Sequence, residues 1–439
     1  MKAATLCVLL VVLFASQAFS TNSRVESMGK SSDFFMDDVG IFENPANINI
    51  YPNFLIGEMG RMVEFSDSNT NYKNQDPSHP YGGGILAFSL NKDKEAETRY
   101  PMICVGAMMN RQNELVDVLE NAAVANGHII PDPVVPNSDF FLGYTMANGI
   151  MLGGHMYAAM QSVTVPGSKM LASQAKLESV GITTGTVAGD TGVFNHYSSQ
   201  RDLEWSSTVV KGDLGINMPL TQNIDMELSF GLGLLSYTGN EDTARLGAFS
   251  IPTYDDNDLS FFVNARWFSS LASLNGEIVP VVKFKRISVR DYQVREITGG
   301  LGANITLDRG FFWAGTEFIH NKTTSPVGNN KTKEETCVSI PLSFGIERNI
   351  VWDWFVMRVG FKKVLYGSQT DQNEMSMLET NPEADMTAAD HVGFGVGLNI
   401  EEKLKIDGVV AEDIPYKWGN LISGNSHHIL TAITATYSF

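Results

Sequence analysis

The chain of 439 residues is long enough for one large barrel or for two ordinary domains. Its formal net charge of −18 argues against a nucleic-acid partner, because nucleic-acid phosphates call for a basic surface. Hydrophobic residues make up 43% of the sequence, yet no apolar block after the first twenty residues reaches the roughly 18 that a spanning helix needs.

The first twenty residues have the layout of a secretory signal peptide. Lys2 supplies a positive charge, residues 3–15 are largely apolar, and Ala18 and Ser20 are small residues at the positions that a signal peptidase reads. We therefore expect residues 1–20 to be removed from a secreted protein. In an oxidising compartment Cys104 and Cys337 could form a disulfide, but we favour two separate thiols buried in strands.

Residues 21–50 precede the first predicted strand and contain an acidic stretch followed by Asn44-Pro45-Ala46. Pro45 fixes its own φ and keeps Asn44 out of the helical region. Asn44 can bond to its own nearby backbone and form a turn. An ordinary turn before a strand and a compact plug both fit this pattern.

Apolar and polar residues alternate in segments of about 9–14 residues, a period that places one face of each strand in an apolar environment. In 225–235, for example, Met226, Leu228, Phe230 and Leu232 alternate with Glu227 and small or polar residues. These segments are long enough to cross a bilayer at a tilt. Sixteen such strands are predicted, near 51–64, 83–91, 101–109, 138–147, 150–161, 202–217, 224–237, 258–268, 277–290, 293–306, 311–321, 334–347, 353–363, 390–400, 403–411 and 427–439.

The predicted connections are alternately short and long, apart from a tight link near Asp291. Short turns on one rim and long loops on the other are typical of outer-membrane barrels. One long connection contains helical spacing over residues 112–125, with apolar Leu115, Val118, Leu119 and Ala122. We expect a surface helix there; a helix folded into the barrel mouth is the alternative.

Several charged residues fall on the polar faces of the predicted strands and are candidate lumen residues. They could orient a polar solute or hold a plug, but ion pairing across a packed lumen is the interpretation we favour, because unpaired buried charge is costly. The candidates are Asp225, Glu227, Arg266, Arg286, Glu296, Glu347, Arg358 and Lys362. Within this set, we expect Arg266, Arg286, Arg358 and Lys362 to pair with Asp33, Asp37, Asp38 and Glu43.

No catalytic motif is present: the sequence lacks a nucleophile elbow, a phosphate-binding loop and zinc-ligand spacing. The acidic tracts at 255–258 and 371–390 could offer oxygen ligands to Ca²⁺, but they lack the glycine and spacing of an EF-hand and are expected to be solvated loops. We expect neither an enzyme nor a cofactor.

The last predicted strand ends the sequence with Tyr437-Ser438-Phe439, and Ile433, Ala435, Tyr437 and Phe439 share one face. This end resembles the C-terminal strand of outer-membrane barrels, which ends in an aromatic residue that the barrel assembly machinery reads. An aromatic girdle near the strand ends is also expected. Its candidates are Trp267, Trp313, Trp352, Tyr366, Trp418 and Tyr437.

Together, residues 33–64 resemble the N-terminal hatch and first strand of the FadL-type long-chain fatty-acid transporters and of their PorV-type relatives in type IX secretion. The order of the elements that follow is also similar. Members of the family usually have fourteen strands, and the sixteen predicted here depart from that number. The expected fold is therefore all-β, a transmembrane antiparallel β-barrel of about 14–16 strands with a short N-terminal hatch. The implied organisation is a signal peptide (1–20), a hatch (21–50) containing Asn44, Pro45 and Ala46, and an outer-membrane barrel (51–439).

Three functions remain open at this point. A barrel in the outer membrane of a Gram-negative bacterium, surrounded by lipid, could transport hydrophobic or small solutes, as the FadL resemblance implies. It could instead hold a secreted protein at its rim in the PorV manner, or act as a structural surface protein through its loops. An apolar cavity joined to the hatch would favour transport. A lumen filled with side chains, together with an open lateral rim, would favour the partner role.

Overall fold

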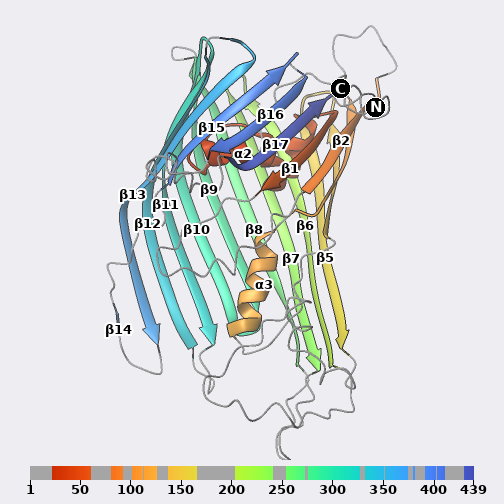
Figure 1. Ribbon diagram of the computed structural model, residues 1–439, viewed down its shortest axis with the longest axis vertical. Helices are drawn as coiled ribbons and strands as arrows, with labels where there is room; N and C mark the ends of the chain where they lie inside the picture. Colours follow the sequence, from red (N-terminus) through yellow and green to blue (C-terminus); the bar gives the residue numbers. More distant parts are fainter. Residues whose placement is uncertain are drawn as a thin grey trace, which may run out of the picture.

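The computed structural model describes residues 22–60, 81–91, 101–111, 113–125, 137–165, 203–240, 254–271, 275–326, 332–350, 352–373, 379–380, 391–401, 403–410 and 430–439. These residues form one antiparallel sheet that closes on itself (Figure 1). The predicted barrel is therefore confirmed, and each of the sixteen predicted segments overlaps one strand of its wall.

The wall consists of sixteen strands. They are β1 (Phe54–Gly60), β2 (Tyr81–Ser89), β3 (Met102–Met109), β4 (Asn137–Thr145), β5 (Met151–Val165), β6 (Leu203–Thr221), β7 (Ile224–Asn240), β8 (Tyr254–Leu271), β9 (Gly276–Val289), β10 (Tyr292–Leu307), β11 (Gly310–Pro326), β12 (Thr332–Asn349), β13 (Phe355–Asn373), β15 (His391–Ile400), β16 (Leu404–Val410) and β17 (Leu430–Ser438). A two-residue strand, β14 (Glu379–Thr380), pairs with the end of β13 outside the ring.

Neighbouring wall strands pair in chain order, and the ring is closed by β1 and β17. Their register runs from Phe54 opposite Ser438 to Gly60 opposite Ala432. Closure leaves neither the first nor the last strand with an unpaired edge. The C-terminal strand therefore completes the wall.

The alternation of side chains follows the prediction, as β7 shows. Glu227 and Ser229 are buried on the inner side, whereas Leu228, Phe230 and Leu232 are exposed on the outer side. Tyr437 and Phe439 lie on the outer side of the closing strand pair, and the Phe439 N–H donates to the Asn53 carbonyl at 3.0 Å.

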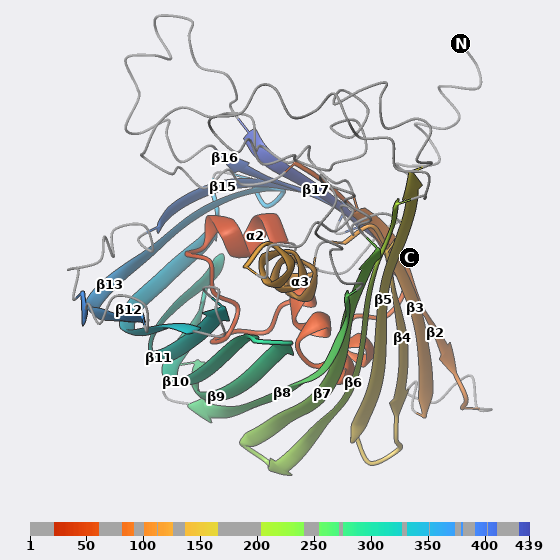
Figure 2. The same ribbon diagram turned by 90° about the horizontal axis from the view of Figure 1, so that it is seen from below.

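Two parts of the described chain lie inside the ring (Figure 2). The first is residues 22–50, here named the N-terminal segment, with α2 (Asn22–Ser27) and the 3₁₀ helices η1 (Asp38–Phe42) and η2 (Pro45–Asn49). The second is α3 (Glu114–Ala125), which packs against β7, β9 and β11. The expectation of a surface helix is wrong, because the apolar stripe of α3 faces the inner wall.

Two further expectations are settled by side-chain positions. Cys104 and Cys337 are both free thiols, as expected, but Cys104 is buried whereas Cys337 is only half-buried. Trp313 does not belong to an interfacial girdle: it is fully buried, and it shares the inner face of β11 with Gly315 and Glu317. Trp352 and Tyr366 are exposed, and Trp418 lies outside the described residues. Among the described helices, none is long and apolar enough to cross a membrane.

Candidate functional site: the N-terminal segment in the lumen

The N-terminal segment crosses the lumen from one side of the wall to the other (Figure 2). Its first helix, α2, contacts β13, β15, β16 and β17, and η2 contacts β3, β4, β5 and β6. The segment then continues directly into β1. Residues from opposite sides of the ring are thus bridged by about thirty consecutive residues, a length that reaches across a barrel of this size.

Asn44, Pro45 and Ala46 form the turn that opens η2. The Asn44 carboxamide oxygen accepts from the Ala46 N–H at 3.1 Å and caps the helix. Its amide donates to the carboxamide oxygen of Asn217 on β6, and Asn217 in turn donates to Asn47 at 2.6 Å. These asparagines are nearly or fully buried, so the tripeptide is both a local turn and a contact with the wall.

This turn packs against inward-facing glycines of the wall. A Cβ at Gly153 of β5 would overlap the Pro45 carbonyl group, and one at Gly215 of β6 would overlap the Asn44 side chain. A Cβ at Gly143 of β4 would lie 2.6 Å from the Asn49 oxygen. The backbone of the segment can approach the wall this closely only because these wall positions carry no side chain.

The rest of the segment also packs against glycines of the wall. The ring of Phe34 rests on Gly302 of β10 and Gly315 of β11, where a Cβ would overlap it. Further along the ring, Gly360 of β13 faces the Met28 backbone and Gly395 of β15 faces Ser27. The wall is therefore shaped to the path of the segment over seven strands. We name Gly143, Gly153, Gly215, Gly302, Gly315, Gly360 and Gly395 the glycine cradle.

Aromatic contacts hold the middle of the segment. Phe34 and Phe35 are buried and lie 5.9 and 5.5 Å, centroid to centroid, from Trp313. Phe35 also meets Phe311 edge to face at 5.2 Å. Such pairs add about 0.5–1.5 kcal/mol each beyond the area that they bury.

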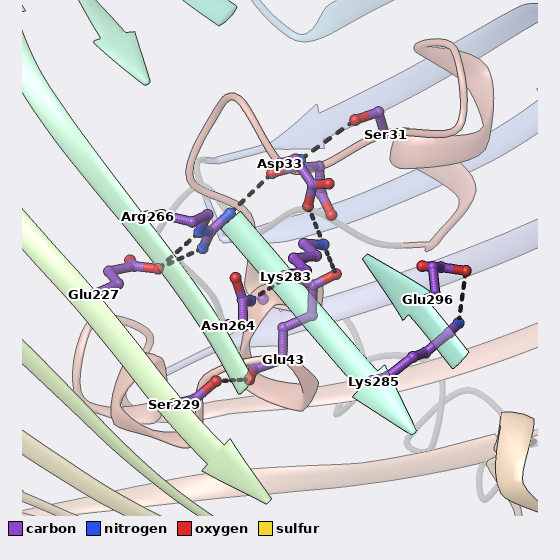
Figure 3. A network of polar contacts seen from close by, with 12 residues as sticks. Ser31, Asp33, Glu43, Glu227, Ser229, Asn264, Arg266, Lys283, Lys285 and Glu296 are labelled. Atoms are coloured by element: carbon purple, nitrogen blue, oxygen red, sulfur yellow. Dashed lines mark hydrogen bonds and ion pairs between the residues drawn. The ribbon is translucent and has the colours of Figure 1, made fainter. Parts of the chain in front are cut away.

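Charged side chains connect the segment to β7, β8 and β9 (Figure 3). Lys283 Nζ binds the Asp33 carboxylate and lies 3.1 Å from Glu43 Oε1. Arg266 donates to Glu227 at 2.6 Å and to the Ser32 carbonyl at 3.0 Å. These contacts are largely shielded from water, so each ionised group has a partner where an unpaired charge would be costly.

A second ionic cluster lies at the opposite side of the ring. Arg24 of α2 donates to Glu347 at 2.6 Å and to Asp37 at 3.0 Å. Glu347 also accepts from Arg358 at 2.6 Å, and Arg358 reaches Asp407 at 2.6 Å. One carboxylate of β12 thus joins an arginine of the segment to an arginine of the wall.

Asp38 is a buried carboxyl of the segment itself, in η1. Burial raises the pKa of Asp38 well above its ordinary value, and the neighbouring Asp37 carboxylate raises it further.

Four of the predicted lumen charges form two cross-strand pairs that contact the segment, Glu227 with Arg266 and Glu347 with Arg358. Lys362 shares the inner face of β13 with Arg358, Glu296 pairs with Lys285 at 3.3 Å, and Asp225 is exposed near the rim. Arg286 was expected in the lumen, but it alternates with the inward Lys285 and Ile287 and lies on the outer face of β9. Apolar and basic residues occur on both faces of β9, which explains the wrong assignment.

The predicted cation partners of the acidic stretch are wrong, because among the described residues its carboxylates pair with other cations. Asp33 and Glu43 pair with Lys283, and Asp37 pairs with Arg24 inside the segment. Arg266 binds a carbonyl of the segment instead of one of its carboxylates. Lys283, Arg24 and the glycine cradle were not predicted, although the glycines on alternating positions of the strands were a visible signal. No cluster of His, Cys, Asp or Glu suited to a metal ion occurs among the described residues.

Comparisons with known proteins give structural likeness alone. No family model and no curated protein matches the chain. Similar solved structures include a Pseudomonas aeruginosa FadL homologue, with 11% identity, a TM-score of 0.40, and coverage of 97% of this chain and 99% of the other. The P. putida toluene transporter TodX has 9% identity, a TM-score of 0.38, and coverage of 96% and 99%.

The CymD monoaromatic hydrocarbon channel has 12% identity, a TM-score of 0.37, and coverage of 96% and 99%. CdiB from Acinetobacter baumannii has 9% identity and a TM-score of 0.37, and the match covers 88% of this chain and 59% of CdiB. FadL-type channels, which the N-terminal motif resembles, are therefore among the similar barrels. Values this low establish no shared function.

Proposed function

We propose that the protein is a transport barrel of the bacterial outer membrane, in which the N-terminal segment acts as the hatch for hydrophobic or small solutes. The outer face of the barrel suits lipid contact. Leu142 and Leu214 are exposed by 60% and 69%, and Leu228, Phe230 and Leu232 continue the apolar surface on β7. An apolar band around a polar interior is the usual division in membrane barrels.

The observation that carries the proposal is the way the N-terminal segment is seated. The segment lies across the lumen, and where it meets the wall the residues of the glycine cradle carry no side chains. Its attachments are hydrogen bonds, ion pairs and ring contacts, all of which can be broken and remade. A segment of this kind can close the barrel and can also be displaced. A packed structural core would not need to be displaced, and a plain tether would not need to close the barrel.

The solute class is inferred from the interior and from the resemblance to the FadL family. The charged side chains in this part of the lumen are paired, Arg266 with Glu227 of the wall and Lys283 with Asp33 of the segment. They therefore offer little net attraction to an ion. Phe34, Phe35 and Trp313 form a buried aromatic cluster in the same region, so displacement of the segment would expose the Trp313 side of the wall to the lumen. Both features favour a small or hydrophobic solute.

Deletion of residues 33–46 tests this function. The deletion removes the ring contacts of Phe34 and Phe35 and the ion pairs of Asp33, Asp37 and Glu43 but leaves β1 to β17 intact, so we expect a folded barrel with heat-modifiable gel mobility. Its conductance in planar bilayers should rise, or its uptake of apolar solutes should change. A folded deletion variant that conducts and takes up solutes like the parent would leave the segment as a tether and favour a partner-binding or structural barrel.

A further inference from the structure

Helix α3 fills a second part of the lumen, farther than α2 from the rim of short turns (Figure 1). Its stripe of Leu115, Val116, Leu119, Ala122 and Ala123 is almost completely buried. The facing wall contributes Tyr157, Val209, Leu235, Tyr237, Ile287 and Val289, all of them buried in the same cluster. An isolated helix of 12 residues is marginal in water, so α3 depends on this wall contact.

The attachment of α3 is local and polar at its start. Asn113 Oδ1 accepts from the Leu115 N–H at 3.0 Å and caps the helix. Glu114 forms an ion pair with Lys285 of β9 at 3.0 Å. Gly233 of β7 leaves space for Leu115, whose side chain would lie 3.2 Å from an added Cβ.

Arg111, three residues before α3, contacts the N-terminal segment. Its guanidinium carbon lies 3.9 Å from the ring centroid of Phe42, the last residue of η1. The same carbon lies 5.7 Å from the ring of Tyr157, which belongs to the cluster under α3. Arg111 therefore stands between the segment and the helix.

The wall holds Arg111 in this position. The guanidinium donates to both oxygens of Asp139, at 2.8 and 3.1 Å. Asp139 also lies 2.8 Å from His155 Nε2, while His155 Nδ1 lies 2.7 Å from Asp213. The His155 ring stacks on Phe141 at 4.5 Å, and Phe141 meets Phe42 edge to face at 5.7 Å. Phe42 is thus seated against a side-chain network that is fixed to β4, β5 and β6.

We propose that α3 is a second plug and that Arg111 couples it to the N-terminal segment, so that displacing one loosens the other. The biological role of this coupling rests on the proposed transport function, whereas the contact between Arg111 and Phe42 does not depend on it. If Phe42 leaves, Arg111 loses its stacked partner and the start of α3 loses its fixed neighbour. Coupling between two sites is reciprocal, so movement of α3 must loosen the seat of Phe42 equally.

Thiol labelling can follow both plugs in the full-length protein. Native Cys104 is buried in one cluster with Ile41 and Ile48 of the segment, so in C337S it reports displacement of the segment. In C104A/C337S/A123C, the new thiol lies on the buried side of α3 and reports displacement of that helix. A membrane-impermeant maleimide is the probe, and heat-modifiable mobility verifies each fold.

Two variants loosen one plug each. Gly215→Ala disturbs the segment, with Gly212→Ala on the outer face of the same strand as its control, since a Cβ there meets nothing within 4 Å. Leu119→Ala disturbs α3, with Glu120→Ala on its exposed side as the control. We expect each loosening variant, but neither control, to speed labelling at both reporters by about threefold or more, the effect of losing a cation–π contact.

Arg111→Gln tests whether Arg111 couples the N-terminal segment to α3. In that background we expect Gly215→Ala to speed labelling of Cys104 only and Leu119→Ala to speed labelling of A123C only. Arg111→Lys should behave similarly, because it keeps the charge but not the flat guanidinium. The proposal is overturned if either loosening variant acts only on its own reporter while Arg111 is present, or if cross-effects persist in Arg111→Gln. Labelling requires no transport, so this result is independent of the conductance of the deletion variant.

Discussion

At the scale of single residues, the N-terminal segment can pack against the wall because the wall has glycine at the contact positions. A methyl group at Gly215 would overlap Asn44, whereas one at Gly212 on the same strand would enter open space. We predict that Gly215→Ala raises the basal conductance and that Gly212→Ala does not. Overpacking of this kind usually costs about 1–3 kcal/mol. Planar-bilayer recordings of the two variants decide this, and equal conductance would show that the glycine contact does not hold the segment.

Asp38 provides a pH test of the same seat. Its pKa is raised in the seated state because the carboxyl is buried beside Asp37. The seated state therefore binds the proton more tightly, and seating is most stable below the ordinary carboxyl pKa of about 4. Its stability falls as pH rises from there towards the raised pKa. We predict that Asp38→Asn removes this part of the pH dependence of Cys104 labelling. An unchanged pH profile would contradict the assignment.

Single residues also show where sequence reasoning succeeds and where it ends. Glu227, Arg266, Glu347 and Arg358 could be placed in the lumen because alternation within one strand fixes the face. The ion pairs that attach the segment could not be predicted in this way, because Lys283 and Asp33 are 250 residues apart and meet only through the closed ring. The Asn-Pro-Ala turn was visible, but its glycine cradle depends on the register between strands.

At the scale of elements, the strands were predictable and the placement of α3 was not. Period-2 alternation identifies a strand and its faces locally. The helical period of 112–125 likewise identified α3 and its apolar stripe. The stripe does not say what it packs against, and its partners on β5, β6, β7 and β9 are brought together only by the barrel. For the same reason β9, with apolar residues on both faces, gave the wrong face for Arg286.

The face assignment of β7 can be tested by depth. Phe230 is exposed on the outer side of the strand, away from the turns, whereas Leu220 is exposed close to the short turn between β6 and β7. We predict that Phe230→Arg lowers the free energy of unfolding by about 2–4 kcal/mol and that Leu220→Arg costs about 0–1 kcal/mol. Urea unfolding in lipid vesicles measures both. Equal losses would mean that β7 is not in contact with lipid at Phe230.

At the scale of the whole molecule, the fold brings both ends of the described chain to the same wall. Ser23 Oγ of α2 lies 2.7 Å from Thr434 Oγ1 of β17, and the other end of the segment continues into β1, the neighbour of β17. A cross-link at Ser23 would therefore fix the segment at both ends. Ser206 and Thr238 offer a matched pair, with hydroxyl oxygens 2.6 Å apart on β6 and β7 within the wall.

The most direct test of the hatch is uptake of an apolar solute by vesicles that contain S23C/T434C in the C104A/C337S background. We predict that uptake stops when this disulfide is formed and returns when it is reduced, while S206C/T238C transports equally in both states. If the oxidised S23C/T434C protein transports as well as the reduced protein, the N-terminal segment is not a movable hatch and the central claim fails.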